Sequence, residues 1–541
     1  MPAWAWRTHT ARMSTLSATP EARTRRQILD GRWVRILLAL AAGAGAALAH
    51  PPFGILPGLL GYPLLMILAE RATTRRGGFW VGWLAGFAYF FISCWWVAEA
   101  FLVDPEQAWM APFAASLLPI GLALFWGLAT VQYRRFNPSG VRRVLVFAAI
   151  FCLFEWLRGH ILTGFPWNPA GASWKAGSEA SQFASVVGVY GLSFVTVAAV
   201  TAFGLVFSDG PRRARYLAAA GGVLALMALV GGGTLRLQQA QLALTNTVVR
   251  VVQADVDQES KWTPEAYQDI LNRYLRLTTQ PGAYLPDLIV WPEGALPASA
   301  NDVFASPDAV AIARAVEPGQ SLILGLGRGV ADPSAPGGGR YFNSLMVLTD
   351  DGGDGLRLSA VYDKYRLVPF GEFLPGSALL TPLGVRALTH MPLDFSAGPR
   401  PAPITVPGAP PVQPLICYEA LYPGFTPGGG ARPRWIVNIS NDAWFGRTSG
   451  PLQHLNLASY RAIETGLPVV RATPTGTSAF IDPWGRVIDN QRLDPGQSGV
   501  IDARLPEPAA PTLYGRWGDL PFAAAVVFGL LASWRRRPKS R

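Results

Sequence analysis

Three short strand-end motifs in the second half of the chain each present a reactive side chain. The side chains are a carboxylate, an amine and a thiol, which belong to Glu293, Lys364 and Cys417. Short runs rich in aliphatic residues are typical of buried strands. The pattern therefore predicts strand ends that present these three groups, with the thiol at the mouth of a pocket.

These residue types together can perform nucleophilic catalysis. A free thiol has a pKa of ~8.5, so a cysteine nucleophile at neutral pH needs a base and a nearby positive charge. Glu293 can be the base, and Lys364 can hold first the thiolate and then the oxyanion of a tetrahedral intermediate. The two other cysteines, Cys94 and Cys152, lie within long apolar segments, where a thiol acts as a small hydrophobe. The alternative for Cys417 is the same role, a buried core residue.

The composition is that of a membrane protein. Only 15% of the 541 residues are charged, and the mean hydropathy is +0.24. The net charge of +11 comes from short basic clusters between apolar segments rather than from one soluble face, so no nucleic-acid partner is expected. The sequence has no CxxC, HxxxH or HExxH pattern, and we therefore expect neither a metal nor another cofactor.

Eight apolar segments are long enough to cross the ~30 Å of hydrocarbon in a bilayer. They lie at 33–49, 54–70, 78–102, 109–131, 143–162, 181–207, 215–233 and 517–534. The sequence thus predicts four parts: a basic, disordered cytoplasmic tail (1–31), a membrane domain of seven helices (32–237), an outer catalytic domain (238–515), and a last helix with a basic tail (516–541). The first part lacks the pattern of a cleavable signal peptide.

Arginines cluster in the amino-terminal tail, in alternate loops and after the last segment. The clusters lie at 7–26, 71–76, 134–143, 212–215 and 535–541. The positive-inside rule then places both termini in the cytoplasm and the block 238–515 on the opposite side of the membrane.

The outer block has the pattern of an α/β domain, in which a central sheet is covered by helices. Its predicted strands are 248–253, 288–291, 321–326, 345–349, 415–417, 435–439, 467–471 and 478–481. Helices are expected at 264–279 and at 452–465, where Gly466 provides the stop. The Gly/Pro-rich stretches 331–340 and 424–433 are expected to be mobile loops.

The three motifs resemble those of the carbon–nitrogen hydrolase (nitrilase) superfamily, which uses a Glu-Lys-Cys triad. They read WPEG at Glu293, YDKYRLVPFGEFLP at Lys364 and ICYEALYP at Cys417. Together with the membrane segments on both sides, nearly the whole chain is similar to the apolipoprotein N-acyltransferase family, a membrane-integrated branch of that superfamily. The lysine and cysteine motifs are long and specific, whereas a lone Trp-Pro-Glu would be weak.

This resemblance implies an αββα sandwich and an acyltransferase. The enzyme would take an acyl chain from a phospholipid, form a thioester on Cys417, and pass the acyl group to the α-amino group of a diacylglyceryl-cysteine at the amino terminus of an apolipoprotein. The resemblance also implies a bacterial inner membrane with the catalytic domain on the periplasmic side. The expected partners are the phospholipid donor, the apolipoprotein acceptor and the membrane, and the chain is expected to be a monomer.

Further positions match the family pattern residue by residue. They are Glu372 as a supporting acid, Tyr418 and Glu419 beside the nucleophile, Trp262 as the tryptophan of a mobile arm, and Asn343 and Trp167 as weaker matches. Structural alternatives stay open for several of these residues. Glu372 could pair with Arg366, and Trp262 could be a core or interface aromatic. His454 is expected to be structural rather than part of a Cys-His dyad.

Two other functional classes fit parts of the sequence. A membrane-tethered amidase would use the same triad on a small soluble amide, but a tether needs only one helix. A transporter would need ionisable groups at the bilayer midplane, whereas Glu99 and Glu155 lie near segment ends. Glu155 is expected to pair with Arg158. A fatty chain of about sixteen carbons is disfavoured in water by ~12 kcal/mol, so a site that uses one must open to the bilayer.

The topology can be tested with a fusion. A reporter that is active only in the cytoplasm, inserted within 331–340, should be inactive because the loop pattern places this stretch outside. Strong activity of that fusion would contradict the topology.

Overall fold

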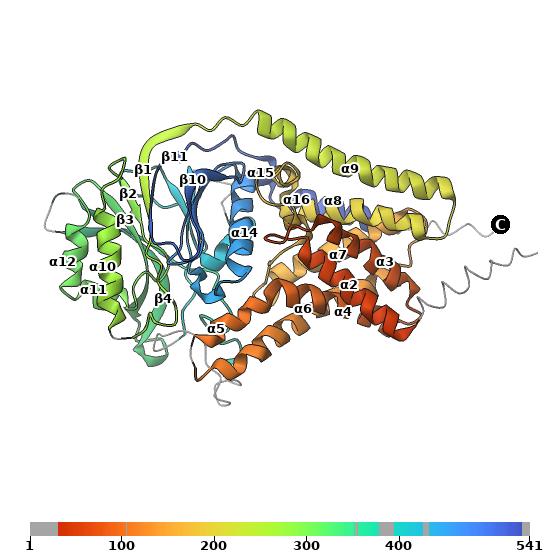
Figure 1. The fold of residues 1–541 in the computed structure, drawn as a ribbon, viewed down its shortest axis with the longest axis horizontal. Helices are drawn as coiled ribbons and strands as arrows, with labels where there is room; N and C mark the ends of the chain where they lie inside the picture. Colours follow the sequence, from red (N-terminus) through yellow and green to blue (C-terminus); the bar gives the residue numbers. More distant parts are fainter. Residues whose placement is uncertain are drawn as a thin grey trace, which may run out of the picture.

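The structure is a computed structural model that describes residues 31–103, 105–263, 265–350, 352, 355–377, 394–425 and 432–532. Helices gather at one end of the molecule and two β-sheets at the other (Figure 1). The predicted basic tail, apart from Gly31, and the arginine cluster after residue 532 lie outside the described residues. So does most of the expected loop 424–433.

Helices occupy all eight of the predicted apolar segments. They are α2 (Arg32–Leu48), α3 (Gly61–Arg71), α4 (Arg75–Cys94), α6 (Ala111–Phe136), α7 (Arg142–His160), α8 (Ala184–Gly204), α9 (Arg212–Gln238) and α16 (Leu520–Leu531). Within the described residues, four helical stretches are long and apolar enough to span a membrane: Arg75–Leu102, Ala108–Phe136, Ala180–Phe207 and Arg212–Gln238. The count of eight crossings and the domain boundaries stay predictions.

The charged pair expected near the end of α7 is confirmed. Arg158 Nη2 lies 2.7 Å from Glu155 Oε2, and both side chains are buried. Trp126 of α6 also donates to Glu155, at 2.9 Å. The two charges therefore compensate each other inside the helical part of the molecule.

The domain that follows α9 holds two mixed sheets in its described part, with strand orders β11-β1-β2-β3-β4-β5 and β10-β9-β8-β7-β6. Parallel pairing joins β1, β2 and β3 in the first sheet and β6, β7 and β8 in the second. The strands are β1 (Leu244–Gln253), β2 (Leu288–Val290), β3 (Ser321–Ala331), β4 (Gly339–Asp350), β5 (Leu356–Asp363), β6 (Val412–Ile416), β7 (Trp435–Ile439), β8 (Val469–Ala472), β9 (Ser478–Ile481), β10 (Val487–Leu493) and β11 (Gly499–Pro506).

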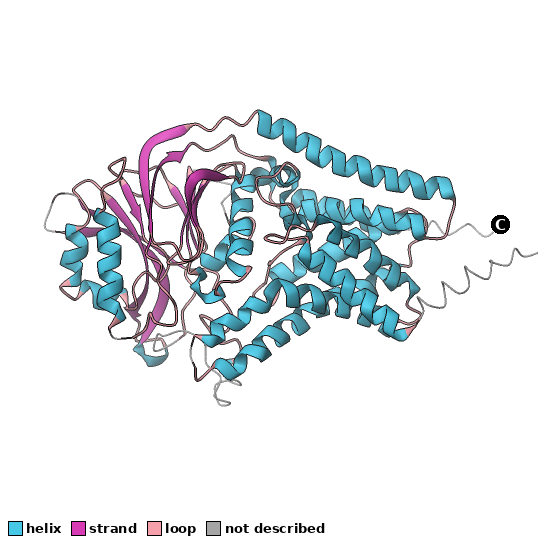
Figure 2. Ribbon diagram, in the orientation of Figure 1, coloured by secondary structure: helices cyan, strands magenta, loops and turns pink. Residues whose placement is uncertain are grey.

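The two sheets pack face to face, and helices cover their outer faces (Figure 2). Ile323 of β3 lies in the core between the sheets, whereas its neighbours Leu322 and Leu324 point to the opposite face. There they pack against α10 (Ala266–Thr279), α11 (Ala300–Phe304) and α12 (Asp308–Arg314). Both faces of the central strands are covered, so their apolar runs are continuous rather than alternating. The αββα sandwich is the predicted fold class.

On the other outer face, α14 (Gly450–Thr465) packs between the five-stranded sheet and the membrane helices. Leu457 and Ile463 of α14 share one buried cluster with Ile436 of β7 and Ala184 of α8. Hydrogen bonds cross the same interface, since Tyr460 donates to the carbonyl of Gly171 at 2.9 Å. The sheet domain is thus fixed to the helical part through a fully packed helix.

All eight strand predictions overlap an observed strand, and three further strands were missed. The missed strands are β5, β10 and β11, and each lies at the edge of its sheet. Their sequences are polar because one side of an edge strand faces solvent, which removes the continuous apolar signal. The predicted loop 331–340 is a hairpin connection, with β3 ending at Ala331 and β4 beginning at Gly339.

Candidate active site

Neighbouring strand ends bring the predicted catalytic side chains together. Glu293 follows β2, Lys364 follows β5 and Cys417 follows β6, while Asn343 lies on β4. Gly325 of β3 permits the close approach of the Glu293 loop, because a Cβ at this position would lie 2.7 Å from the Cα of Glu293. The two face-to-face sheets therefore place these groups at one edge of the sandwich.

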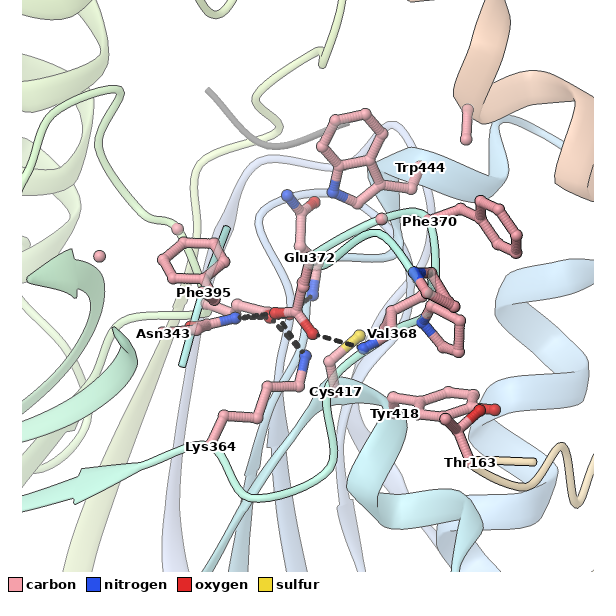
Figure 3. Close-up of a pocket in the computed structure, with 18 of the residues that line it drawn as sticks. Thr163, Asn343, Lys364, Val368, Phe370, Glu372, Phe395, Cys417, Tyr418 and Trp444 are labelled. Atoms are coloured by element: carbon pink, nitrogen blue, oxygen red, sulfur yellow. Dashed lines mark hydrogen bonds and ion pairs between the residues drawn. The ribbon is translucent and has the colours of Figure 1, made fainter. Parts of the chain in front are cut away.

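Two carboxylates share one ammonium and one amide in a buried cluster (Figure 3). Lys364 Nζ lies 3.2 Å from Glu293 Oε1 and 3.0 Å from Glu372 Oε1. Asn343 Nδ2 donates to the same two oxygens, at 2.7 and 2.6 Å. The structure thus places Glu372 in this cluster rather than beside Arg366.

The second oxygen of each carboxylate is held by a backbone N–H. The N–H of Asn441 donates to Glu293 Oε2 and that of Val368 to Glu372 Oε2, both at 2.8 Å. With donors on both oxygens, neither carboxylate is free to rotate. The orientation of Glu293 is therefore set before a substrate binds.

The thiol of Cys417 lies at the edge of this cluster. Its sulfur points toward the carboxylate of Glu372 and the ammonium of Lys364 in Figure 3. Burial, followed by the negative charge of Glu293, raises the pKa of the Cys417 thiol to about 12, although Lys364 acts in the opposite direction. The thiol is consequently protonated at neutral pH in the resting site, and its attack on a substrate requires proton transfer to a base.

Lys364 stays charged although it is almost fully buried. Burial alone would lower the pKa of Lys364, but the two carboxylates and Cys417 outweigh it and raise the pKa above its ordinary value. The ammonium therefore supplies a permanent positive charge beside the thiol, which can stabilise an oxyanion.

Glu419 does not line the cavity, but it holds backbone segments next to the site. Its Oε1 accepts from the hydroxyl of Tyr362 at 2.6 Å and from the N–H groups of Tyr365 and Arg366 at 2.8 and 3.1 Å. Its Oε2 accepts from the N–H of Ile416 at 2.8 Å. One carboxylate thus ties the strand end before Cys417 to the loop that follows Lys364.

Tyr418 connects the segment of Cys417 to the helical part of the molecule. Its hydroxyl donates to the carbonyl of Gly164, in the loop after α7, at 2.7 Å. Tyr422 donates to the same carbonyl at 2.9 Å. The one-turn helix η9 (Cys417–Leu421) is thereby fastened to the loop 161–166.

A cavity of about 1940 Å³ extends from the cluster to the membrane helices. Glu293, Lys364 and Cys417 form part of its wall. The opposite wall consists of apolar side chains from the end of α4 through α6, among them Val97, Phe101, Leu117, Leu124 and Leu128. A polar reaction centre therefore faces one continuous apolar space.

The two predicted tryptophans lie in different places. Trp262 is 39% exposed and lines the cavity, with the Lys261 ammonium 5.6 Å from its ring. Trp167 is buried behind the cavity wall, where its Nε1 donates to Gln453 at 2.7 Å. Trp262 can contact a substrate from this position, whereas Trp167 does not line the cavity.

Two site residues escaped the sequence analysis. Asn441, which orients Glu293, follows the predicted strand 435–439, so the pattern of a polar residue after an apolar run could have identified it. Lys261 is buried in the cavity wall and donates to the carbonyl of Gly294. Burial lowers the pKa of Lys261 to about 8 against the opposing effect of Glu293. Its sequence context carries no signal of burial.

The domain organisation is matched by two known families. Residues 42–202 match the apolipoprotein N-acyltransferase N-terminal domain, and residues 248–510 match the carbon–nitrogen hydrolase family. The fold and the site thus define a carbon–nitrogen hydrolase domain combined with a membrane-helix domain.

Full-length relatives narrow this class further. An apolipoprotein N-acyltransferase of Caulobacter vibrioides is 48% identical over 93% of this chain and 95% of its own length. One from Rhodopseudomonas palustris is 40% identical over 94% and 97%. The chain belongs to the apolipoprotein N-acyltransferase family, as the sequence motifs predicted, and this membership supports an acyltransferase activity. A solved structure of a Nesterenkonia amidase from the nitrilase superfamily is 17% identical and aligns over 52% of this chain and 97% of its own. Its TM-score is 0.34, so the family membership does not rest on it.

The role of Glu419 can be tested with Glu419→Gln. The carboxylate accepts hydrogen bonds from four donors, whereas the amide of glutamine turns its own N–H groups toward some of them and leaves those donors without an acceptor. We therefore expect a loss of about 2 to 3 kcal/mol of stability and a lower Tm in detergent. Tyr362→Phe is the matched control, because it removes one of the four donors and leaves the carboxylate in place; it should lower Tm less. Equal Tm values for both variants and the unmodified protein would contradict this role.

Proposed function

We propose that this protein transfers an acyl chain from a phospholipid, through a thioester on Cys417, to the α-amino group of a diacylglyceryl-cysteine at the amino terminus of apolipoproteins. Glu293, Lys364 and Cys417 form the catalytic triad of this proposal. The protein acts as a monomer in the bacterial inner membrane, with its catalytic domain in the periplasm.

The continuous cavity is the observation that carries this proposal. Pockets for small molecules have volumes of ~300–1,000 Å³, so about 1940 Å³ exceeds the need of a small soluble amide. Leu117, Leu124 and Leu128 line the cavity from α6, yet they are 60%, 47% and 48% exposed. In a membrane, such side chains face acyl chains. The cavity is therefore open to lipid on the side of α6.

The apolar wall also supports a lipid donor energetically. Each methylene removed from water contributes ~0.8 kcal/mol, so a long acyl chain partitions into a bilayer or an apolar cavity. A site that opens to the bilayer receives such a chain without passing it through water. The ester carbonyl, at the polar end of the chain, then lies near the polar end of the cavity.

In the first half-reaction, the sulfur of Cys417 attacks the ester carbonyl and the thiol proton moves to Glu293. The ammonium of Lys364 stabilises the oxyanion of the tetrahedral intermediate. When the intermediate collapses, the C–O bond of the ester breaks and Glu293 returns the proton to the leaving oxygen. A lysophospholipid departs, and the acyl group stays on Cys417 as a thioester.

In the second half-reaction, the neutral α-amine of the diacylglyceryl-cysteine attacks the thioester. Glu293 accepts a proton from the nitrogen, the C–S bond breaks, and the thiolate regains the proton. The products are an amide and the free thiol. The apolar wall of the cavity limits access of water, which would otherwise hydrolyse the thioester.

The order of these events gives a test. In vesicles of phospholipid alone, the protein should release about one lysophospholipid per active site and retain an acyl group on Cys417 that hydroxylamine removes. Addition of a diacylglyceryl-cysteine peptide should clear the adduct and yield an N-acylated peptide. Mass spectrometry of protein and products measures each step.

Two variants and one rival substrate complete this test. Cys417→Ala should abolish both steps, while Cys94→Ala, which changes a buried cysteine in α4, should leave them intact. Lysophospholipid release only in the presence of the peptide, with no trapped adduct, would contradict the two-step mechanism. Ammonia release from a soluble amide without any need for lipid would favour an amidase.

A further inference from the structure

A second buried polar cluster contacts the backbone of Cys417 itself. His454 of α14 places its Nε2 3.2 Å from the carbonyl oxygen of Cys417 and its Nδ1 2.9 Å from Asp442 Oδ1. Arg471 of β8 contacts both oxygens of Asp442, at 2.8 and 2.7 Å. His454, Asp442 and Arg471 are all buried. The imidazole therefore links an ion pair to the peptide group of the nucleophile.

The charges of Asp442 and Arg471 compensate each other without a charge on His454. Burial would raise the pKa of Asp442, but Arg471 and His454 outweigh it and lower this pKa to about 2. Burial and the charge of Arg471 hold the pKa of His454 below its ordinary value. The imidazole is therefore neutral, and it carries one N–H. Both ring nitrogens face an acceptor oxygen, Nδ1 that of Asp442 and Nε2 that of Cys417. Nδ1 also lies 3.2 Å from Arg471 Nη2, from which its lone pair can accept. We therefore assign the single N–H to Nε2, where it donates to the Cys417 carbonyl.

Cys417 needs such support because of its backbone. Its φ of +49° lies in the left-handed region, which is unfavourable for a residue with a Cβ. Conformations of this kind persist where the surrounding contacts fix them. Glu419 holds the N–H of Ile416 on one side of Cys417, and His454 holds the carbonyl of Cys417 on the other.

We propose that His454 is a positioning residue for Cys417: its Nε2–H holds the Cys417 carbonyl and thereby fixes the direction of the thiol and of the following peptide group. The peptide plane is rigid, so the N–H of Tyr418 points away from this carbonyl. The inference rests on the proposed role of Cys417 as the nucleophile. It replaces the expectation that His454 is structural only.

The helical part of the molecule supports the same histidine. The ring of Trp167, from the loop after α7, lies 5.8 Å from the His454 ring, centre to centre, and the ring of Phe445, from the sheet domain, lies 5.6 Å from it. The adjacent Gln453 accepts from Trp167 Nε1 at 2.7 Å and from Trp96 Nε1 at 3.3 Å. Two indoles from the helical part thus hold the first turns of α14, and through them the position of the imidazole.

The test compares His454→Met with His454→Gln. The two side chains have the same length, but only glutamine offers an N–H toward the Cys417 carbonyl. Acylation is followed as the burst of p-nitrophenolate from the p-nitrophenyl ester of a fatty acid, with purified full-length protein in detergent. We expect the methionine variant to be slowed about 10²-fold in the burst rate, with an unchanged amplitude and KM, and the glutamine variant to recover to within about tenfold of the unmodified protein.

Equal burst rates in the two variants, whether fast or slow, would overturn the inference, because the N–H would then have no role. If the methionine variant fails to fold, His454→Asn takes its place. The shorter amide of asparagine reaches toward Asp442 and not toward Cys417. A burst of His454→Asn as fast as that of His454→Gln would overturn the inference. The ester needs neither phospholipid nor apolipoprotein. An unmodified protein that reacts with this ester but not with phospholipid would therefore count against the proposed function alone.

Discussion

The buried cluster of two carboxylates and one ammonium is the interaction on which the rest of this site depends. Glu293 and Glu372 are almost fully withdrawn from water, and Lys364 is the cation that contacts both. Removal of one partner from a buried ion pair costs about 3–5 kcal/mol, because the remaining charge has no compensation. The cluster therefore fixes both the charge and the geometry of the site. Burial, followed by the charge of Glu293, raises the pKa of the Cys417 thiol at the edge of the cluster, and the Lys364 ammonium lies beside it, where it can stabilise an oxyanion.

The fold meets this constraint by bringing strand ends from two sheets to one edge. Glu293 and Cys417 follow buried strands and Lys364 follows the edge strand β5, while the backbone N–H groups of Asn441 and Val368 hold the carboxylates from the adjoining loops. Glu419 links the segment of Cys417 to the loop that follows Lys364. On the far side, α14 connects the same segment to the helical part of the molecule, so the reaction centre is packed against the helices that line the cavity.

The sequence predicts the strands that precede Glu293 and Cys417, because both faces of these strands are buried and their apolar runs are unbroken. It does not predict the edge strands β5, β10 and β11, whose polar faces break that signal. The contact of Glu372 and Asn343 with Lys364 depends on the path of the lysine loop across the sheet, which no local pattern encodes. The burial of Lys261 and the packing of Trp167 behind His454 likewise arise from tertiary contacts between distant segments.

The central claim is that Glu293 takes the proton from a thiol that is protonated at rest, and the pH dependence of Cys417 alkylation tests it most directly. In the unmodified protein, the rate of modification by iodoacetamide, followed by mass spectrometry of the Cys417 peptide, should rise about tenfold per pH unit from pH 7 to 10 without a plateau. Burial is the main cause of the raised thiol pKa, and Glu293→Gln leaves it in place but removes the negative charge that raises this pKa further. This variant should therefore alkylate faster at pH 7 although it no longer transfers acyl groups. A plateau by pH 7 in the unmodified protein, or slower alkylation in Glu293→Gln, would contradict the account.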